Sequence, residues 1–218
     1  MILGSDWYTN RPEFQSKLAI LRSYIENIDD EFPVEETYMG KRGAMVVDVI
    51  TSRQRQYSTR VVKIVKEWAH SVPEATLKEL AKNPLDKKFF GLREGESESI
   101  TNVAQGLLKF GVDFGIDDED LICLIWATAV EGFRFAPKLD PYVGHVDGMG
   151  IALFAYLRKL SGEEAIKPDL RVRQRLQSIG FDVPEGSQAL MLLCEILAAE
   201  LGIPRSSFDS YLWREPSN

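Results

Sequence analysis

Cysteine and histidine are scarce in this chain of 218 residues, which contains two of each. Cys123 and Cys194 lie in the apolar segments LICLIW and MLLCEIL, and neither has a partner at the spacing of metal ligands. We therefore expect two buried thiols, and the sequence supports neither a disulfide framework nor an iron–sulfur cluster.

Long hydrophobic runs are also missing. No apolar stretch reaches the roughly 18 residues of a membrane span. The N-terminus lacks the basic region and apolar run of a signal peptide. We therefore expect a cytoplasmic protein without a membrane partner. With 44% hydrophobic residues, the chain can still bury a sizeable core, which argues against disorder.

An excess of positive charge is absent as well, because the formal net charge is -7. This balance opposes a simple nucleic-acid-binding surface, since affinity for DNA comes largely from neutralising phosphates. The charge is uneven, however: residues 52–66 and 167–175 are basic, whereas acids gather in 26–36, 94–98 and 113–120. Screening limits repulsion from distant acids to about a Debye length of 8–10 Å. DNA binding then requires that the two basic segments meet.

Apolar residues recur at helical spacing along most of the chain. In ITNVAQGLLKF they form one stripe of an amphipathic helix: Ile100, Val103, Ala104, Leu107 and Leu108. Strict alternation is scarce, and AMVVDVIT (44–51) fits either a strand or a buried helix. Near the C-terminus, Ser206 and Asp209 have the spacing of a capping box. We predict an all-α fold without repeats or a long linker.

Two glycines, Gly148 and Gly150, flank Met149 in VDGMG, directly before the helical run IALFAYLRKL. This pattern predicts a tight turn between two helices. The free amides at the start of the second helix would suit a phosphate. In the alternative interpretation, the glycines serve the geometry of the turn alone.

Asp169 follows Pro168 and precedes LRVRQRLQSIG, in which Val172, Leu176 and Ile179 share one helical face. An aspartate at this position is a natural N-cap, because its carboxylate accepts hydrogen bonds from free amides and interacts favourably with the helix dipole. In a cleft, the same carboxylate could orient or deprotonate water, or stabilise a cationic sugar as a base leaves.

The order of glycine hairpin, helix and aspartate before a basic helix resembles the helix–hairpin–helix DNA glycosylases, closest to their alkyl-base branch. VDGMGIALFAYL is similar to the hairpin and KPDLRVRQR to the catalytic aspartate segment. VITSRQRQYSTRVVKIV is similar to an early helix with a wedge residue, and PEATLKELA and FDSYLW resemble two further helices. The resemblance covers residues 44 to 213.

This resemblance implies one domain over 1–218 with a two-lobed helical fold and an active-site cleft between the lobes. Residues 44–135 would form the central lobe, 136–180 the hairpin and aspartate segment, and 181–218 C-terminal helices that pack with the N-terminal part. Asp169 would be the catalytic carboxylate. The backbone of Gly148, Met149 and Gly150 would hold a DNA phosphate, with a monovalent or divalent cation bound by the backbone.

Further site residues follow from the same resemblance. Gln54 or its neighbour Arg53 would fill the gap left by the extruded base. The other arginines expected to contact DNA are Arg55, Arg171, Arg173 and Arg175. Four aromatic residues are candidates for a base pocket: Trp126, Phe133, Phe135 and Tyr142. Packing in the core is the alternative for them and is favoured for Trp126, which lies in an apolar run.

One departure from the family pattern decides the predicted chemistry. Members that also cleave the strand use a lysine just after the hairpin glycines, where this chain has Ala152. The resemblance therefore implies a monomeric, monofunctional enzyme that acts on double-stranded DNA carrying a modified base. It would use water, need no cofactor and leave an abasic site. The alternative is a non-enzymatic helical module that binds DNA or a protein partner, in which Asp169 only caps a helix.

Overall fold

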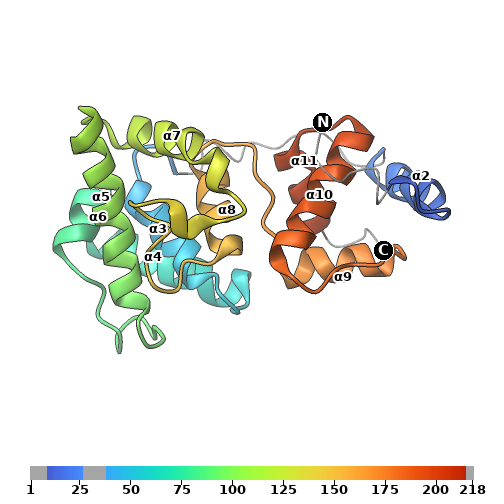
Figure 1. Ribbon diagram of the computed structural model, residues 1–218. Helices are drawn as coiled ribbons and strands as arrows, with labels where there is room; N and C mark the ends of the chain where they lie inside the picture. The colour runs from blue at the N-terminus through green and yellow to red at the C-terminus, as the bar shows by residue number, and fades with distance from the viewer. Residues whose placement is uncertain (1–8, 27–37, 215–218) are drawn as a thin grey trace. The chain divides into compact units, whose positions relative to one another are not determined.

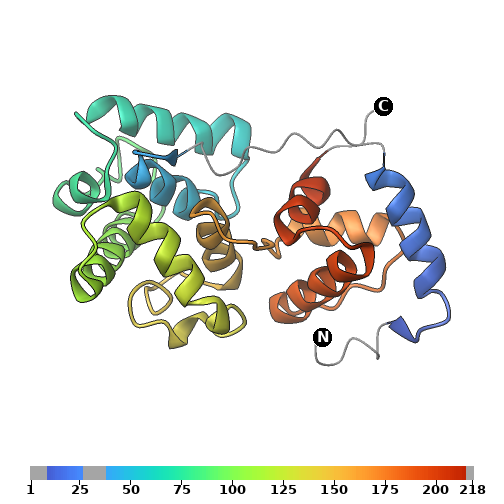
Figure 2. The same ribbon diagram turned by 90° about the horizontal axis from the view of Figure 1, so that it is seen from above.

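The computed structural model describes residues 9–26 and 38–214, and helices with their connections account for all of them, with no strand in these ranges (Figures 1 and 2). The predicted all-α class is confirmed. These residues divide into two units. The middle unit comprises residues 38–163, and the terminal unit comprises 9–26 and 164–214. The expected segment 136–180 therefore contributes to both units.

The middle unit contains six α-helices in its described residues, together with a short π-helix, η2, and two single-turn 3-10 helices, η3 and η4. In chain order they are α3 (Arg42–Thr51), η2 (Tyr57–Val61), α4 (Val62–Ser71), α5 (Leu77–Lys82), α6 (Glu96–Phe114), α7 (Glu119–Ala129), η3 (Glu131–Phe133), η4 (Pro137–Leu139) and α8 (Ile151–Leu160).

Helix α3 is the centre of the middle unit. It contacts α4, α5, α6 and α8, and every one of its residues is buried. A helix that is covered on all sides is apolar all round, which explains why segment 44–51 showed no periodicity. Gly43 lets α5 approach closely, because a Cβ there would lie 2.3 Å from the carbonyl oxygen of Thr76.

Helix α6 forms one wall of the candidate site and has the predicted stripe. Its Ile100, Val103, Ala104 and Leu107 are buried in the core, and Leu108 is half-buried. Its opposite face meets the segment that leads into the glycine turn. At that contact, a Cβ on Gly106 would lie 1.9 Å from the carbonyl oxygen of Tyr142. Only glycine permits this approach.

The core of the middle unit contains one carboxylate that binds three tyrosines. Asp48 on α3 is 1% exposed. Its Oδ2 accepts hydrogen bonds from the hydroxyls of Tyr38 (2.5 Å) and Tyr57 (2.6 Å), and its Oδ1 accepts one from Tyr156 (3.1 Å). Burial, followed by the charge of Asp48, raises the pKa of Tyr57 to about 12 and the pKa values of Tyr38 and Tyr156 as well. The hydroxyls therefore stay protonated as donors.

The terminal unit contains α2 (Phe14–Ile25), α9 (Leu170–Ser178), α10 (Ser187–Leu201) and α11 (Arg205–Trp213). Helix α10 contacts both α2 and α11, and α9 contacts α11. Cys194 lies in this core and Cys123 in that of the middle unit, so the prediction of buried thiols is confirmed. Leu18 and Leu21 of α2 are buried in the same core as Cys194.

The predicted capping box at Ser206 and Asp209 is wrong. Pro204, not Ser206, is the N-cap of α11, and both predicted residues lie inside the helix. The amide and hydroxyl of Ser206 donate to the Glu164 carboxylate, each at 2.8 Å. Asp209 accepts a hydrogen bond of 2.8 Å from the amide of Lys167. Both side chains thus fasten residues 164–167 to α11 instead of closing the helix end.

No single helix among the described residues has the length and apolar character needed to cross a membrane. Helices α10 and α11 satisfy that criterion only as a pair, and the pair is bent by 110°.

The tyrosine cluster makes the middle unit sensitive to Asp48→Asn. The amide retains one acceptor oxygen for three hydroxyls and turns an NH₂ group towards donors, so at least one buried donor loses its partner. We expect the free energy of unfolding, measured with urea, to fall by about 1–3 kcal/mol. Glu67→Gln removes only an exposed i,i+4 pair with Lys63 and should cost under about 0.5 kcal/mol. Equal costs would contradict the role of Asp48.

Candidate functional site

The glycine turn ends directly before α8, and one of its glycines has a conformation that other residues avoid. Gly148 has φ +83°, in the left-handed region that favours glycine. Gly150 is the N-cap of α8 with extended backbone, and no side chain caps the amides of the first turn. Between them, the Met149 side chain is buried in the core and anchors the turn. A DNA contact at Met149 is therefore limited to its backbone.

The expected helix before the turn is wrong. After η4, residues 140–147 form a series of turns, and Asp140 organises them. The Asp140 carboxylate is fully buried and accepts hydrogen bonds from the amides of Tyr142, Val143 and Gly144 at 2.8 to 3.1 Å. A side chain that satisfies nearby amides replaces the backbone acceptors of a helix. Asp140 is thus the reason that this segment is irregular.

A second exposed element, which we call the wedge loop (residues 52–56), follows α3. Gln54 at its tip is exposed and has φ +51°, the only positive φ of a non-glycine residue in the described part of the chain. The Arg93 guanidinium donates to the carbonyl oxygens of Arg53 (2.7 Å) and Gln54 (2.8 Å). These bonds hold a backbone conformation that most residues avoid.

Arg55 does not face solvent as a DNA contact would require, so this prediction is wrong. Its guanidinium forms two hydrogen bonds of 2.7 Å with the Glu96 carboxylate. The side chains are 9% and 1% exposed. Glu96 also accepts a 2.7 Å bond from the amide of Arg93. The bidentate ion pair between Arg55 and Glu96 joins the wedge loop to the start of α6 and stabilises both.

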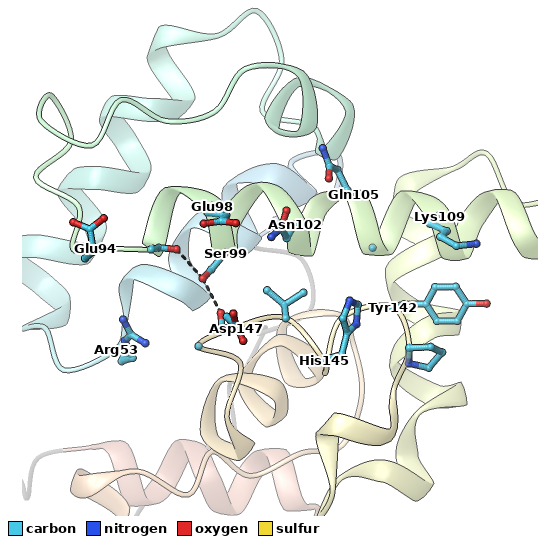
Figure 3. A pocket seen from close by; sticks show the side chains of 15 residues that line it. Arg53, Glu94, Glu98, Ser99, Asn102, Gln105, Lys109, Tyr142, His145 and Asp147 are labelled. Carbon is cyan, nitrogen blue, oxygen red and sulfur yellow. Dashed lines mark hydrogen bonds between the residues drawn. The ribbon is translucent and has the colours of Figure 1, made fainter.

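The wedge loop and the glycine turn meet, although they are far apart in the sequence. A Cβ on Gly148 would lie 3.2 Å from Nη1 of Arg53 and 3.5 Å from Oγ of Ser99. Ser99 donates a 2.7 Å hydrogen bond to the carbonyl oxygen of Asp147 and thereby ties the turn to α6 (Figure 3). Two elements that were expected to contact DNA are therefore neighbours within one unit.

A groove of about 800 Å³ runs from this junction between α6 and residues 141–148. Figure 3 shows Arg53 and Glu94 at one end, Lys109 and Tyr142 at the other, and polar side chains between them. Its charged lining residues are Arg53, Glu94, Glu98, Lys109 and Asp147. Because acids outnumber bases, the groove as a whole does not suit a phosphate backbone.

Asp169 is the N-cap of α9 in the terminal unit. Its Oδ1 accepts hydrogen bonds from the amides of Arg171 (3.0 Å) and Val172 (3.1 Å), so the N-cap interpretation is confirmed. The side chain remains 20% exposed, and its Oδ2 lies 4.0 Å from Nζ of the buried Lys167. Burial raises the pKa of Asp169 above its usual value, and the Lys167 ammonium opposes this rise.

Two of the three arginines on α9 serve their own unit. Arg173 donates to the carbonyl oxygens of Pro184 and Glu185, and Arg175 donates to that of Arg214. The DNA contacts of Arg173 and Arg175 stay predictions, and both side chains also hold the backbone of their own unit. Arg171 is exposed, with its guanidinium carbon 4.9 Å from the centre of the Trp213 ring. Alternate residues diverge around a helix, which separates Arg171 from the others.

The four candidate aromatics do not form one pocket. Trp126 has no exposed surface, and its Nε1 donates to Asp140 (3.3 Å), so it belongs to the core and the base-pocket prediction is wrong there. Tyr142 lines the groove and donates to Asp113 (3.0 Å). Phe133 and Phe135 are half-buried and are not among the lining residues of the groove.

Several residues of the site gave no recognisable signal in the sequence. Arg93 and Glu96 act through partners in the wedge loop, which only the folded chain brings near. Asp140 binds amides two to four residues further on, and no motif marks it. In the described residues, no group of three or more His, Cys, Asp or Glu side chains could hold a metal ion. No family model, curated protein or solved structure matches the chain.

The two glycines should respond differently to substitution. Gly148→Ala places a Cβ at positive φ and against Arg53, and we expect a loss of about 1–2 kcal/mol in the free energy of unfolding. Gly150→Ala meets no atom within 4 Å and has φ -95°. In this variant the weaker N-cap lowers the free energy of unfolding, and the smaller entropy of the unfolded chain raises it. We expect the net change to stay within about 0.5 kcal/mol. Urea unfolding of both variants tests this difference, and a reversed order would refute it.

Proposed function

We propose that the chain is a monofunctional DNA glycosylase that acts as a monomer on double-stranded DNA. It would rotate a modified nucleotide out of the duplex, hydrolyse its N-glycosidic bond and leave an abasic site. Under this proposal the two units are the lobes of the helix–hairpin–helix glycosylase fold. The observation that carries the proposal is the junction of Arg53 with Gly148, which unites a wedge and a phosphate site.

The phosphate would bind at the glycine turn. A helix start without a side-chain cap leaves amides for an anion, and the helix dipole favours negative charge there. The adjacent guanidinium of Arg53 adds a positive charge. Gln54 at the tip of the wedge loop would enter the gap left by the everted base. Eversion costs a few kcal/mol and is easiest for damaged or mispaired bases.

Asp169 would act on the sugar. Its Oδ1 is bound to two amides, which fixes the carboxylate, while Oδ2 takes no part in the cap. A fixed carboxylate stabilises the positive charge that develops on the sugar as the bond to the base breaks. The oxygen of water then bonds to the sugar carbon, the base leaves with the electron pair, and the water proton passes through Oδ2 to solvent.

Strand cleavage is not part of the proposed reaction. Ala152 in the first turn of α8 has no amine to attack the sugar. Lys159, the nearest lysine in sequence, is buried in the last turn of the same helix. A lysine without access to DNA cannot form an imine with it, so the proposed product is an intact abasic site.

A non-enzymatic DNA-binding or protein-interaction module of the same fold is the second candidate. It is favoured by the capping bonds of Asp169, which are a sufficient structural role for this residue, and by the acids of the groove. Binding of a duplex without base release would identify a DNA-binding module. Absence of both would indicate a protein-interaction module.

Asp169→Asn tests the proposed chemistry. Asparagine is as good an N-cap as aspartate, so the variant should fold and bind DNA. Release from duplexes with a panel of modified bases, measured as strand breaks after hot alkali, should fall at least about 10²-fold. Asp118 caps α7 in the same way, by accepting from the amide of Leu121, and Asp118→Asn is the matched control. Equal release by Asp169→Asn and the wild type would reject the assignment.

Lys167→Gln tests the environment of the carboxylate through pH dependence. The raised pKa of Asp169 means that activity is lost on acidification at a higher pH than for an ordinary aspartate. Without the Lys167 charge, that pKa rises further, so the acid limb of kcat/KM should move to higher pH. Lys167→Arg should restore the wild-type limb. A uniform loss of activity at every pH would show that Lys167 only supports the fold.

A further inference from the structure

Lys138 places an ammonium against the glycine turn. The residue lies in η4, and its Nζ donates to the carbonyl oxygens of His145 (3.1 Å) and Val146 (3.0 Å). These two residues precede Gly148 by three and two positions in the chain. A cation is therefore already fixed to the backbone of the turn, and the chain itself supplies it.

The other carbonyls of the turn are engaged too. Asp147 accepts from Ser99 Oγ at 2.7 Å, and Gly148 accepts from the amide of Gly150 at 3.1 Å. Gly150 accepts from the amide of Phe154 at 2.9 Å. The carbonyl of Val146, in addition to Lys138, accepts from the amide of Met149 at 3.0 Å. The turn thus has hydrogen-bond donors on most of its oxygen atoms.

A metal ion bound by the backbone of Gly148 and Gly150, as the family resemblance implies, does not fit this arrangement. A hard cation needs several oxygen ligands at once; calcium, for example, takes about 6–8. The oxygens here point at protein donors. An ion that shared them with Lys138 would also meet a like charge, and repulsion between like charges at close range disfavours its binding.

We infer that Lys138 is the built-in cation of the glycine turn and replaces a metal ion there. The ammonium holds the carbonyls of residues 145 and 146 and so keeps the amides in the first turn of α8 oriented outwards. Phosphate binding at these amides then needs no metal ion. That Lys138 replaces a metal ion follows from its hydrogen bonds alone. That phosphate binds at these amides rests on the proposed function.

The test compares Lys138→Met with Lys63→Met and Lys138→Arg. Lys63 is an exposed lysine of α4 in the same unit, with a 64% exposed side chain, and serves as the matched control. Thermal unfolding is followed in tetramethylammonium, sodium, potassium and magnesium chlorides at equal ionic strength. The tetramethylammonium sample contains a chelator. This bulky cation cannot enter the turn, so it defines the state without a bound ion.

We expect the Tm of the wild type to be the same in all four salts. In tetramethylammonium chloride, Lys138→Met should lose about 2–6 °C relative to Lys63→Met, because two charge-assisted hydrogen bonds disappear. Sodium or potassium chloride should restore part of the Tm of Lys138→Met, because these ions can bind to the vacated carbonyls. The Tm of Lys138→Arg should fall little. A wild-type Tm that rises with a metal ion would overturn the inference, as would a loss that is equal in every salt.

A second measurement separates this inference from the proposed function. A fluorescent duplex is titrated with each variant in the same salts. The wild type should respond to ionic strength and not to the identity of the cation, and Lys138→Met should bind more weakly in tetramethylammonium chloride. If the wild type binds no duplex in any salt, DNA binding fails as a function, while the thermal data still decide whether Lys138 replaces a metal ion.

Discussion

The hydrogen bonds between Asp48 and three tyrosines are the interaction on which the middle unit depends. A charge in the centre of a fully buried helix is tolerated only when it is completely hydrogen-bonded. The partners come from the segment before α3, from the start of η2 and from α8. One carboxylate therefore joins the helix that follows the glycine turn to the chain that follows the wedge loop. It sets the position of both elements at their buried ends.

Separate contacts hold the exposed ends of the same elements. The wedge loop is fastened by Arg55 to Glu96 and by Arg93 to its backbone, so its tip keeps a conformation that costs energy. The glycine turn is fastened by Ser99 to α6 and by Lys138 to η4. A site whose supporting side chains are fixed in this way loses little entropy when a ligand binds. The junction of Arg53 and Gly148 has such support on both sides.

The sequence predicted those features that depend on neighbouring residues. The stripe of α6, the glycine turn before α8 and the cap at Asp169 follow from local periodicity and backbone preferences. The helix of residues 44–51 could not be distinguished from a strand, because a segment buried on all sides has no polar face to reveal its period. The irregular segment before Gly148 was missed because the acceptor that replaces its helix is a side chain, Asp140.

The internal partners of the arginines were not predicted, for a different reason. Charge in a sequence shows how many cations exist and not which acceptors they meet after folding. Arg55 lies beside Glu96. Arg173 binds a carbonyl 11 residues further along the chain, and Arg175 binds one 39 residues further along. Trp126 shows the same effect among the aromatics, because its ring is covered by the core and its indole nitrogen binds Asp140.

The internal use of cations changes how a protein of net charge -7 can bind DNA. Arg42, Arg55 and Arg158 pair with carboxylates, so the exposed positive charge is smaller than the composition suggests. Affinity from counterion release grows with the number of phosphates neutralised and must then be modest. A helix start binds phosphate through amides and adds no net charge. Under the proposed function, an acidic chain would hold DNA where such amides lie near a cation, and Arg53 lies against Gly148 in the turn before α8.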